Sequence, residues 1–324
     1  MNEFALIAHY FARKPRRADV RVGIGDDGAV VAFGDGMECV ASVDMLVEGR
    51  HFATGADPRQ LGHKTLAVNL SDLAAMGARP RYALLAGALP TSDAEWLSAF
   101  MRGFDALAAR YDVELIGGDT TRGPLTLCVT VLGDVPAGQA ITRGGAKPGD
   151  DVYVSGTLGD AALGLAARLG RIDVDADALQ LAGGRLDAPQ PRVALGMALR
   201  RMASAAIDVS DGLTGDLGHI LEMSRVGATL DVAALPASAA LRARLRGSSR
   251  DVALACLLAG GDDYELCFTA APALRARIDA VAHDLSLALT RIGAITASAG
   301  LVVRDETGAA MSALPRAFDH FAPA

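Results

Sequence analysis

The sequence predicts a two-domain protein of the α+β class whose N-terminal half has α/β character. Its 324 residues allow two domains of ordinary size, and a hydrophobic content of 51% is ample for packed cores. Strand-like and helix-like apolar patterns alternate along the first half of the chain. A Pro- and Gly-rich stretch near residues 136–151 then interrupts them. We therefore expect one domain at 1–136 and a second at 137–324.

The N-terminal domain is predicted from apolar residues that recur at helical spacing or gather in short strand-like runs. In chain order, we expect an amphipathic helix through Phe4, Ile7 and Phe11, strands at 20–24, 29–33 and 38–44, a helix within 63–80, a strand at 82–89, a helix at 95–111, and strands at 114–116 and 125–132.

The C-terminal domain mixes strands and helices without strict alternation. We expect strands at 152–155, 227–232, 264–269, 289–295 and 300–304, with the last two paired, and helices at 160–169, 192–202, 213–224, 238–246, 251–258 and 273–284. Residues 171–191 are expected to form a connection without regular structure.

The helix within 63–80 is apolar on nearly every side, which predicts a buried helix. Gly77 and Pro80 supply its stop signal. Thr65, Asn69 and Asp72 nevertheless fall on one narrow line along it. A carboxylate on a buried helix needs a cation, a proton or several hydrogen-bond donors. Asp72 is therefore a candidate metal ligand, and Thr65 and Asn69 are candidates to orient it.

Composition excludes several classes of protein. The formal net charge of −7 and the pI of about 5.4 argue against a nucleic-acid or anionic-membrane partner. No apolar run has membrane-spanning length, and we expect the first residues to form an amphipathic helix and not a signal peptide. No pair of the four cysteines has metal-ligand or redox spacing. We therefore predict that Cys39, Cys128, Cys256 and Cys267 are core residues of a reduced, cytoplasmic protein.

Acidic residues recur beside glycines or at predicted strand ends. The positions are Asp26 and Asp27, Asp44, Asp72, Asp119, Asp208 and Asp211, and Asp262 and Asp263. Oxygen ligands from several segments suit Mg²⁺ better than zinc. For any single site, ordinary Asp-Gly turn chemistry is an equally good interpretation; the recurrence favours metal binding.

Other motifs have competing interpretations. Gly23-Ile-Gly-Asp-Asp-Gly matches the dinucleotide fingerprint, but a strand pattern follows it and two carboxylates would repel a pyrophosphate. Arg143 stands on a Gly-rich loop and is able to clamp phosphate oxygens, or it belongs to a solvated linker. His51 is either a substrate contact or a structural histidine. Phe318 would ordinarily belong to a C-terminal packing clasp.

Five motifs occur together in one order: Gly23-Ile-Gly-Asp-Asp-Gly-Ala-Val-Val, Asn69-Leu-Ser-Asp-Leu-Ala-Ala-Met-Gly-Ala, Gly117-Gly-Asp-Thr-Thr-Arg-Gly-Pro, Asp208-Val-Ser-Asp-Gly-Leu and Gly260-Gly-Asp-Asp-Tyr-Glu-Leu. In combination they resemble the thiamine-monophosphate kinase family, over nearly the whole chain. The wider superfamily, with aminoimidazole ribonucleotide synthetase, shares the two-domain plan and an Asp-rich ATP site.

The resemblance implies transfer of the ATP γ-phosphoryl group to thiamine monophosphate with the help of several Mg²⁺ ions. It also implies a homodimer whose N-terminal domains join their sheets, with ATP between the two domains of the chain. The implied metal ligands are Asp27, Ser42, Val43, Asp44, Asp72, Asp119, Asp208 and Asp211. The implied ATP contacts are Gly118, Asp119, Arg143 and Ser210. The implied substrate contacts are His51, Asp262 and Phe318.

Asp72, Asp119 and Arg143 are the residues we expect to carry catalysis, by direct in-line transfer that needs no strong general base. Two positions depart from the family pattern. Val43 stands where Thr is common, so it offers a metal only its backbone carbonyl. Asp262 stands where Glu is common, one methylene shorter. The alternatives are an ATP-dependent synthetase of the same superfamily and a non-catalytic regulator that binds thiamine phosphates or ATP.

Overall fold

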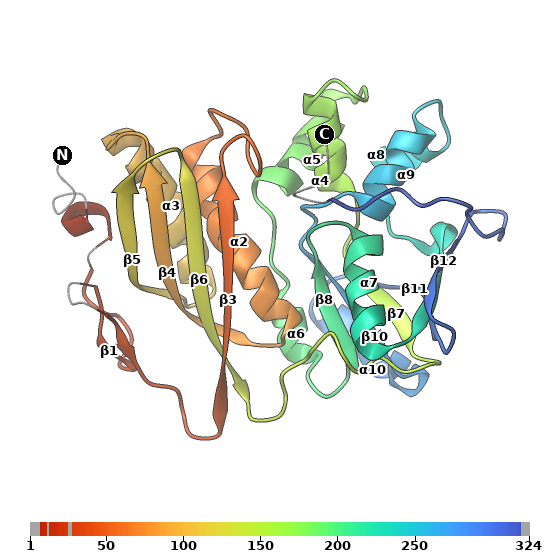
Figure 1. The fold of residues 1–324 in the computed structure, drawn as a ribbon, viewed down its shortest axis with the longest axis horizontal. Helices are drawn as coiled ribbons and strands as arrows, with labels where there is room; N and C mark the ends of the chain where they lie inside the picture. The colour runs from red at the N-terminus through yellow and green to blue at the C-terminus, as the bar shows by residue number, and fades with distance from the viewer. Residues whose placement is uncertain (1–6, 12, 25–27, 319–324) are drawn as a thin grey trace. The chain divides into compact units, whose positions relative to one another are not determined.

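The computed structural model describes residues 7–11, 13–24 and 28–318. It divides into two compact units (Figure 1). Unit 1 comprises Met1–Leu73 and Ala78–Ala140, and unit 2 comprises Ala74–Gly77 and Ile141–Ala324. The last turn of one helix therefore belongs to unit 2.

Unit 1 contains two sheets and two long helices. In chain order its elements are the π-helix η1 (Ile7–Phe11), β1 (Val20–Val22), β2 (Val30–Val31), β3 (Met37–Val47), α2 (Pro58–Ala75), β4 (Arg79–Leu89), α3 (Ala94–Arg110), β5 (Glu114–Arg122) and β6 (Thr126–Pro136). Strands β1 and β2 form an antiparallel pair at either end of the Gly-rich motif, so a strand follows that motif as predicted. Asp27 lies outside the described residues.

The main sheet of unit 1 has the strand order β3-β6-β4-β5, so β3 and β5 are its two edges. Only the β4–β5 pair is parallel. Helices α2 and α3 lie behind the sheet in Figure 1. They approach each other closely at Gly62 and Gly103, where an added Cβ would fall 2.0 and 1.8 Å from a backbone oxygen of the other helix. The opposite face of β3 carries exposed apolar side chains.

Helix α2 confirms the prediction of a buried helix. Leu66, Leu70, Leu73 and Ala74 have no exposed surface. The helix begins at Pro58, earlier than predicted, and ends before Gly77, which has a left-handed φ of +66°. Asp72 itself is half-buried rather than fully enclosed.

Unit 2 is built on a six-stranded sheet in the order β12-β9-β11-β7-β10-β8. Its strands are β7 (Asp151–Ser155), β8 (Ala205–Val209), β9 (Gly227–Asp231), β10 (Glu265–Ala270), β11 (Leu289–Thr296) and β12 (Gly300–Arg304). Its helices are α4 (Asp160–Arg168), α5 (Ala176–Asp187), α6 (Val193–Ala198), α7 (Leu213–Ser224), α8 (Ala239–Leu245), α9 (Arg250–Ala259) and α10 (Arg275–Asp284), with short 3-10 turns η2 (Val232–Ala234) and η3 (Pro272–Leu274).

Several predicted elements of unit 2 were wrong. The connection at 171–191 contains helix α5, which Asp175 caps by accepting a hydrogen bond from the Ala178 N–H. Strand β8 was not predicted. The last two strands do not pair with each other, because β9 lies between β11 and β12.

Two expectations outside unit 2's sheet also need correction. Strand β5 was expected to end at residue 116, but it continues through Gly117, Gly118 and Asp119 to Arg122. Cys39 is exposed rather than in the core, whereas Cys256 and Cys267 are buried as expected. Over the described part of the chain, no helix is long and apolar enough to cross a membrane.

Candidate functional site

A polar line along α2 faces the edge strand β3. The Ser42 hydroxyl donates a hydrogen bond of 2.5 Å to Asp72 Oδ2. The backbone N–H of Asp44 donates to Asn69 Oδ1 at 3.0 Å, and Asn69 Nδ2 donates to the Thr65 carbonyl at 3.1 Å. Ser42, Asp44 and Asp72 are therefore brought together in unit 1 by one helix and one strand.

The roles of the two polar neighbours on α2 differ from the sequence expectation. Asn69 was expected to orient Asp72, but it holds the backbone of Asp44 instead. Thr65 Oγ1 donates to the Leu61 carbonyl at 2.7 Å, a bond within the helix. Ser42 donates a hydrogen bond to Asp72, so a residue of the strand helps to orient the carboxylate of the helix.

Val43 and His51 lie farther along the same strand and its turn. The Val43 side chain is 58% exposed and projects to the face opposite Ser42 and Asp44. Nδ1 of His51 accepts a hydrogen bond of 3.0 Å from the Val47 N–H. This bond requires an unprotonated Nδ1, so the neutral ring carries its proton on Nε2. His51 is thus held at a defined orientation after the end of β3.

Gly118 and Asp119 lie on β5, at the opposite edge of the sheet from Asp44. The ladders align Asp44 with Val129, Val129 with Leu85, and Leu85 with Gly118. Three strand spacings separate the two edges, which is about 14 Å at about 4.8 Å per spacing. Asp119, the next residue, faces the other side of the sheet. Within one chain, the structure does not bring Asp119 beside Asp44 and Asp72.

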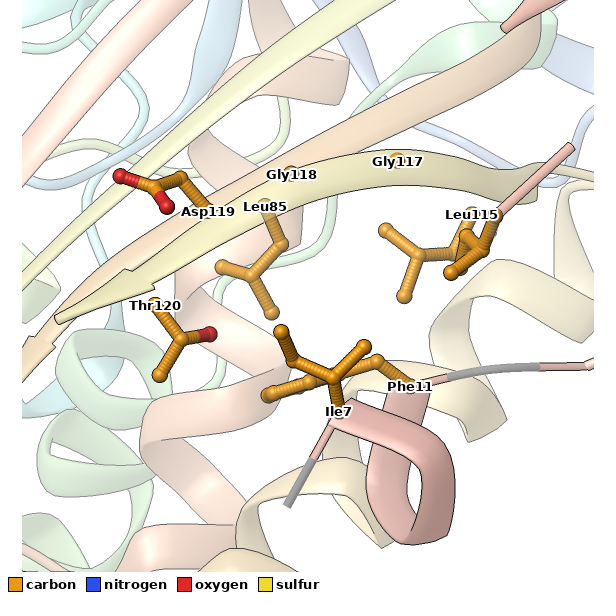
Figure 2. Close-up of a pocket in the computed structure, with 9 residues that line it drawn as sticks. Ile7, Phe11, Leu85, Leu115, Gly117, Gly118, Asp119 and Thr120 are labelled. Atoms are coloured by element: carbon orange, nitrogen blue, oxygen red, sulfur yellow. The ribbon is translucent and has the colours of Figure 1, made fainter. Parts of the chain in front are cut away.

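A small pocket of about 40 Å³ lies against β5, between that strand and η1. Figure 2 shows Ile7 and Phe11 below the strand, with Leu85, Leu115 and Thr120 on the same side. Gly118 has a φ of +152°, and a Cβ there would fall 1.9 Å from the Leu85 carbonyl oxygen. Only glycine fits this point in the pocket wall.

In unit 2, the end of β8 and the loop that follows it carry three of the predicted site residues. Asp208 is the fourth residue of β8 and is 5% exposed, whereas Ser210 and Asp211 are half-buried. Gly212 then turns into α7 with a φ of +115°, and a Cβ at that position would fall 2.5 Å from the backbone of Ala259. The tight turn explains the glycine of the Asp-x-Ser-Asp-Gly motif.

The same loop holds the two predicted substrate residues of unit 2. The Asp262 N–H donates to the Ser210 carbonyl at 2.8 Å, and the Phe318 N–H donates to the Asp211 carbonyl at 3.2 Å. Asp262 and Tyr264 both have left-handed backbone, with φ of +68° and +50°. Because such conformations are costly for residues other than glycine, this segment is held by its surroundings. The structure therefore brings Ser210, Asp211, Asp262 and Phe318 together.

Buried carboxylates support these loops from behind. Oδ2 of Asp216 accepts hydrogen bonds of 3.0, 3.1 and 3.1 Å from the N–H groups of Ser210, Asp211 and Gly212. Burial raises the pKa of Asp216 to about 7, although those hydrogen bonds act to lower it. Oδ2 of Asp263 accepts a hydrogen bond of 2.7 Å from the Gly159 N–H, and burial raises the pKa of Asp263 well above the ordinary value.

Glu265, at the start of β10, is the buried carboxylate of a group of ion pairs at this end of the sheet. Only 1% of its side chain is exposed. It accepts a 2.6 Å hydrogen bond from Ser155 Oγ and pairs with the guanidinium groups of Arg192 and Arg185. A buried carboxylate paired in this way fixes the junction between β7, β10 and the helices that carry the arginines.

Arg143 is exposed on the loop that follows the first unit. Its carbonyl accepts a hydrogen bond of 3.1 Å from Ser224 Oγ. The Ser224 hydroxyl oxygen in turn accepts hydrogen bonds of 3.1 Å from the N–H groups of Gly145 and Ala146. The backbone of the loop is thus tied to the end of α7, while the guanidinium reaches outward.

The donor chemistry of the predicted metal ligands fits Mg²⁺. Ser42, Asp44 and Asp72 present oxygen atoms only, and two of those oxygens already converge to 2.5 Å. Asp208 and Asp211 offer the same chemistry in unit 2. Among the residues that the structure describes, no three His, Cys, Asp or Glu side chains form a ready-made group.

The sequence prediction assigned no supporting role to Asp216, Asp263 or Glu265. A signal existed for each. Asp216 lies in the first turn of a helix, four residues after a glycine turn, where a carboxylate accepts backbone N–H groups. Asp263 and Glu265 stand in the Gly-Gly-Asp-Asp-Tyr-Glu motif, in which Asp263 was counted among the acidic residues beside glycines but only Asp262 was given a role.

Comparison with known families defines the class first. The AIR synthase related N-terminal domain matches residues 25–135, and the AIR synthase related C-terminal domain matches residues 147–306. Hydrogenase maturation protein HypE shares this fold at 20% identity and a TM-score of 0.76. The chain is thus a two-domain protein of the AIR synthase related class, with mixed sheets and helices as the sequence predicted.

Full-length relatives narrow the class. The thiamine-monophosphate kinase of Salmonella typhimurium is 48% identical, over 99% of this chain and 98% of its own length. A crystal structure of thiamine-monophosphate kinase from Stenotrophomonas maltophilia is 50% identical, with a TM-score of 0.86 over 95% of this chain and 98% of its own. The complex of AaThiL with AMPPCP and TMP is 28% identical, with a TM-score of 0.77 over 92% of each chain. The chain belongs to the thiamine-monophosphate kinase family, which confirms the resemblance found in its motifs.

Proposed function

We propose that this chain transfers the γ-phosphoryl group of ATP to thiamine monophosphate, giving thiamine diphosphate and ADP in the cytoplasm. The observation that carries the proposal is the loop after β8. Ser210 and Asp211, proposed for nucleotide and metal, hold Asp262 and Phe318, proposed for the substrate, through their own carbonyls. Phosphoryl transfer needs donor and acceptor at one place, and this loop joins both sets of residues.

We propose that Mg²⁺ ions are held by Asp27, Ser42, Val43, Asp44, Asp72 and Asp119 in unit 1 and by Asp208 and Asp211 in unit 2. Bound there, the ions would neutralise phosphate charge as two anions approach. The hydrogen bond from Ser42 fixes the Asp72 carboxylate, and Asn69 fixes the strand that carries Asp44. The helix thus keeps both carboxylates in place.

The remaining proposed roles belong to binding and orientation. Gly118 is proposed as an ATP contact through its backbone; a Cβ at this position would meet the Leu85 carbonyl oxygen of the neighbouring strand, so β5 carries no side chain here. Arg143 supplies positive charge to phosphate oxygens from a loop whose backbone is tied down. His51, with its proton on Nε2, is a hydrogen-bond donor for the substrate. The acceptor phosphate is ionised near neutral pH, so no side chain has to act as a strong base.

We propose a homodimer because, within one chain, Asp119 lies far from Asp44 and Asp72. In one chain, Asp119 lies about 14 Å from the edge strand with Asp44, given the strand spacing. Val43 and Met45, which are 58% and 55% exposed, form an apolar strip on the outer face of β3. We propose that this strip pairs with a second copy and that the partner's Asp119 completes the set formed by Asp44 and Asp72.

A coupled assay of ADP release tests the proposal. We expect release only when ATP, Mg²⁺ and thiamine monophosphate are all present. ADP release with another acceptor, and none with thiamine monophosphate, would identify a synthetase of the same superfamily. Binding of both compounds without ADP release would identify a regulator.

A further inference from the structure

The carboxylate of Asp216 lies behind the loop at 208–212 and has no place in the reaction described above. A single oxygen of this side chain accepts the N–H groups of three successive residues, Ser210, Asp211 and Gly212, at 3.0 to 3.1 Å. Three successive N–H groups that converge on one oxygen form a compact anion-binding nest. Here the chain's own carboxylate fills the nest.

Helix α7 holds that carboxylate firmly. Leu213, Leu217 and Ile220 are buried in the core of unit 2, with at most 1% of their surface exposed. Thr214 Oγ1 donates a hydrogen bond of 3.0 Å to the Leu258 carbonyl of α9. The helix therefore cannot shift without disturbing the core, and Asp216, which is 4% exposed, has a fixed position.

The other side of the loop is equally occupied. Its carbonyl groups accept the N–H groups of Asp262, Tyr264 and Phe318 at 2.8, 2.8 and 3.2 Å. Gly261 packs against it so closely that a Cβ there would fall 2.4 Å from the Ser210 carbonyl oxygen. A displacement of the loop would consequently move the residues proposed for substrate as well as those proposed for ATP and metal.

We propose that Asp216 is a positioning residue for phosphoryl transfer: by accepting the three N–H groups of Ser210, Asp211 and Gly212, it fixes the loop that carries both halves of the site in unit 2. The expected effect on kcat/KM rests on the proposed function. The expected effect on the order of the loop does not. Asp216 is 4% exposed and turned towards the loop N–H groups, so we assign it no direct contact with ATP or thiamine monophosphate.

Three variants separate positioning from general stability. Asp216→Ala removes the acceptor oxygen, whereas Asp216→Asn keeps an oxygen of the same reach. Asp151→Asn is the matched control, because Asp151 is also a buried carboxylate of unit 2, 2% exposed, but it pairs with Arg275 and Arg291 at the start of β7. We expect Asp216→Ala to lower kcat/KM about 100-fold, the cost of a displacement of about 1 Å at a reacting site. Asp216→Asn should recover most of that loss, and Asp151→Asn should stay within about twofold of the parent.

Amide hydrogen exchange provides a readout that does not depend on the reaction. In Asp216→Ala, the amides of Ser210, Asp211 and Gly212 should lose protection, while those of β7 and β10 keep it. Titration with Mg²⁺ and an ATP analogue should show weaker binding even if the acceptor is not thiamine monophosphate, so failure of the proposed function is recognised separately. Unchanged binding and kcat/KM in Asp216→Ala would overturn the inference. Equal inactivity of Asp216→Ala and Asp216→Asn with full amide protection would overturn it too, because it would indicate a direct chemical role.

Discussion

Mixing two inactive variants tests whether Asp72 and Asp119 of different chains share one site. Asp72→Asn removes the carboxylate that Ser42 contacts on α2, and Asp119→Asn removes the one at the far edge of the sheet. We expect each variant alone to fold and to lack turnover at saturating ATP. In a dimer with one chain of each kind, one site carries both substitutions and the other carries neither.

The order of the strands in the sheet determines how much activity the mixture should regain. If β3 of one chain is completed by β5 of its partner, then random exchange gives mixed dimers in about half of the population, and about one quarter of all sites are intact. An equimolar mixture should therefore regain about 25% of the parental rate, after subunit exchange has been verified with differently labelled chains. The coupled ADP assay measures the recovery.

The same mixture can also contradict the proposal of a site shared between two chains. Should Asp72 and Asp119 act within one chain, no mixed dimer would have an intact site, and the rate would stay at the level of the separate variants. A mixture of Asp72→Asn with the double variant serves as the control. It forms mixed dimers as well, but every site in it lacks the Asp72 carboxylate, so no arrangement of sites restores activity.

Three further outcomes follow from local geometry. Gly118→Ala should lower the free energy of unfolding by about 3 kcal/mol, measured by urea denaturation, because its Cβ would meet the Leu85 carbonyl and its φ is left-handed. Replacing Val43 and Met45 by Asp should weaken the proposed dimer at least about tenfold in sedimentation experiments, since charge would replace the exposed apolar strip. Asp263→Asn should gain stability relative to the parent as pH rises. The pKa of Asp263 is higher in the folded state, so the folded state holds the proton more tightly, and stability present below pH about 4 is lost as pH rises towards that higher pKa. Thermal melts of both proteins between about pH 5 and pH 8, above the unfolded pKa of Asp, measure this difference. If the Asp263 carboxylate were ionised without cost in the folded state, the difference in melting temperature between variant and parent would not change with pH.

Local patterns predicted the elements whose signals are contained in their own residues. Helix α2 was found because its apolar residues surround it and Gly77 ends it. Strand β6 was found because its apolar residues are β-branched or large. Helix α5 was missed because Gly183 and Gly184 weaken its helical pattern, although its N-cap Asp175 was visible.

Other features were not predicted because they depend on contacts between segments that are distant in the sequence. Strand β12 is local in sequence to β11 but pairs with β9, and no property of residues 300–304 alone specifies that choice. The contact between Ser42 and Asp72 joins residues 30 positions apart. The motif order suggested that both residues belong to one site, but only the tertiary structure reveals that the strand orients the helix carboxylate.

The acidic residues of unit 2 illustrate why a motif alone cannot assign roles. Asp211, Asp216, Asp262 and Asp263 all stand near glycines, so proximity to a glycine does not distinguish their roles. Burial separates them: Asp216 and Asp263 are 4% and 8% exposed and accept backbone N–H groups, whereas Asp211 and Asp262 are half-buried. A carboxylate that already satisfies backbone donors in the interior stabilises a loop, and one that remains accessible on the same loop is able to meet a cation or a substrate. The Asp-rich pattern therefore combines buried carboxylates that hold backbone N–H groups with accessible carboxylates that we propose for metal and substrate.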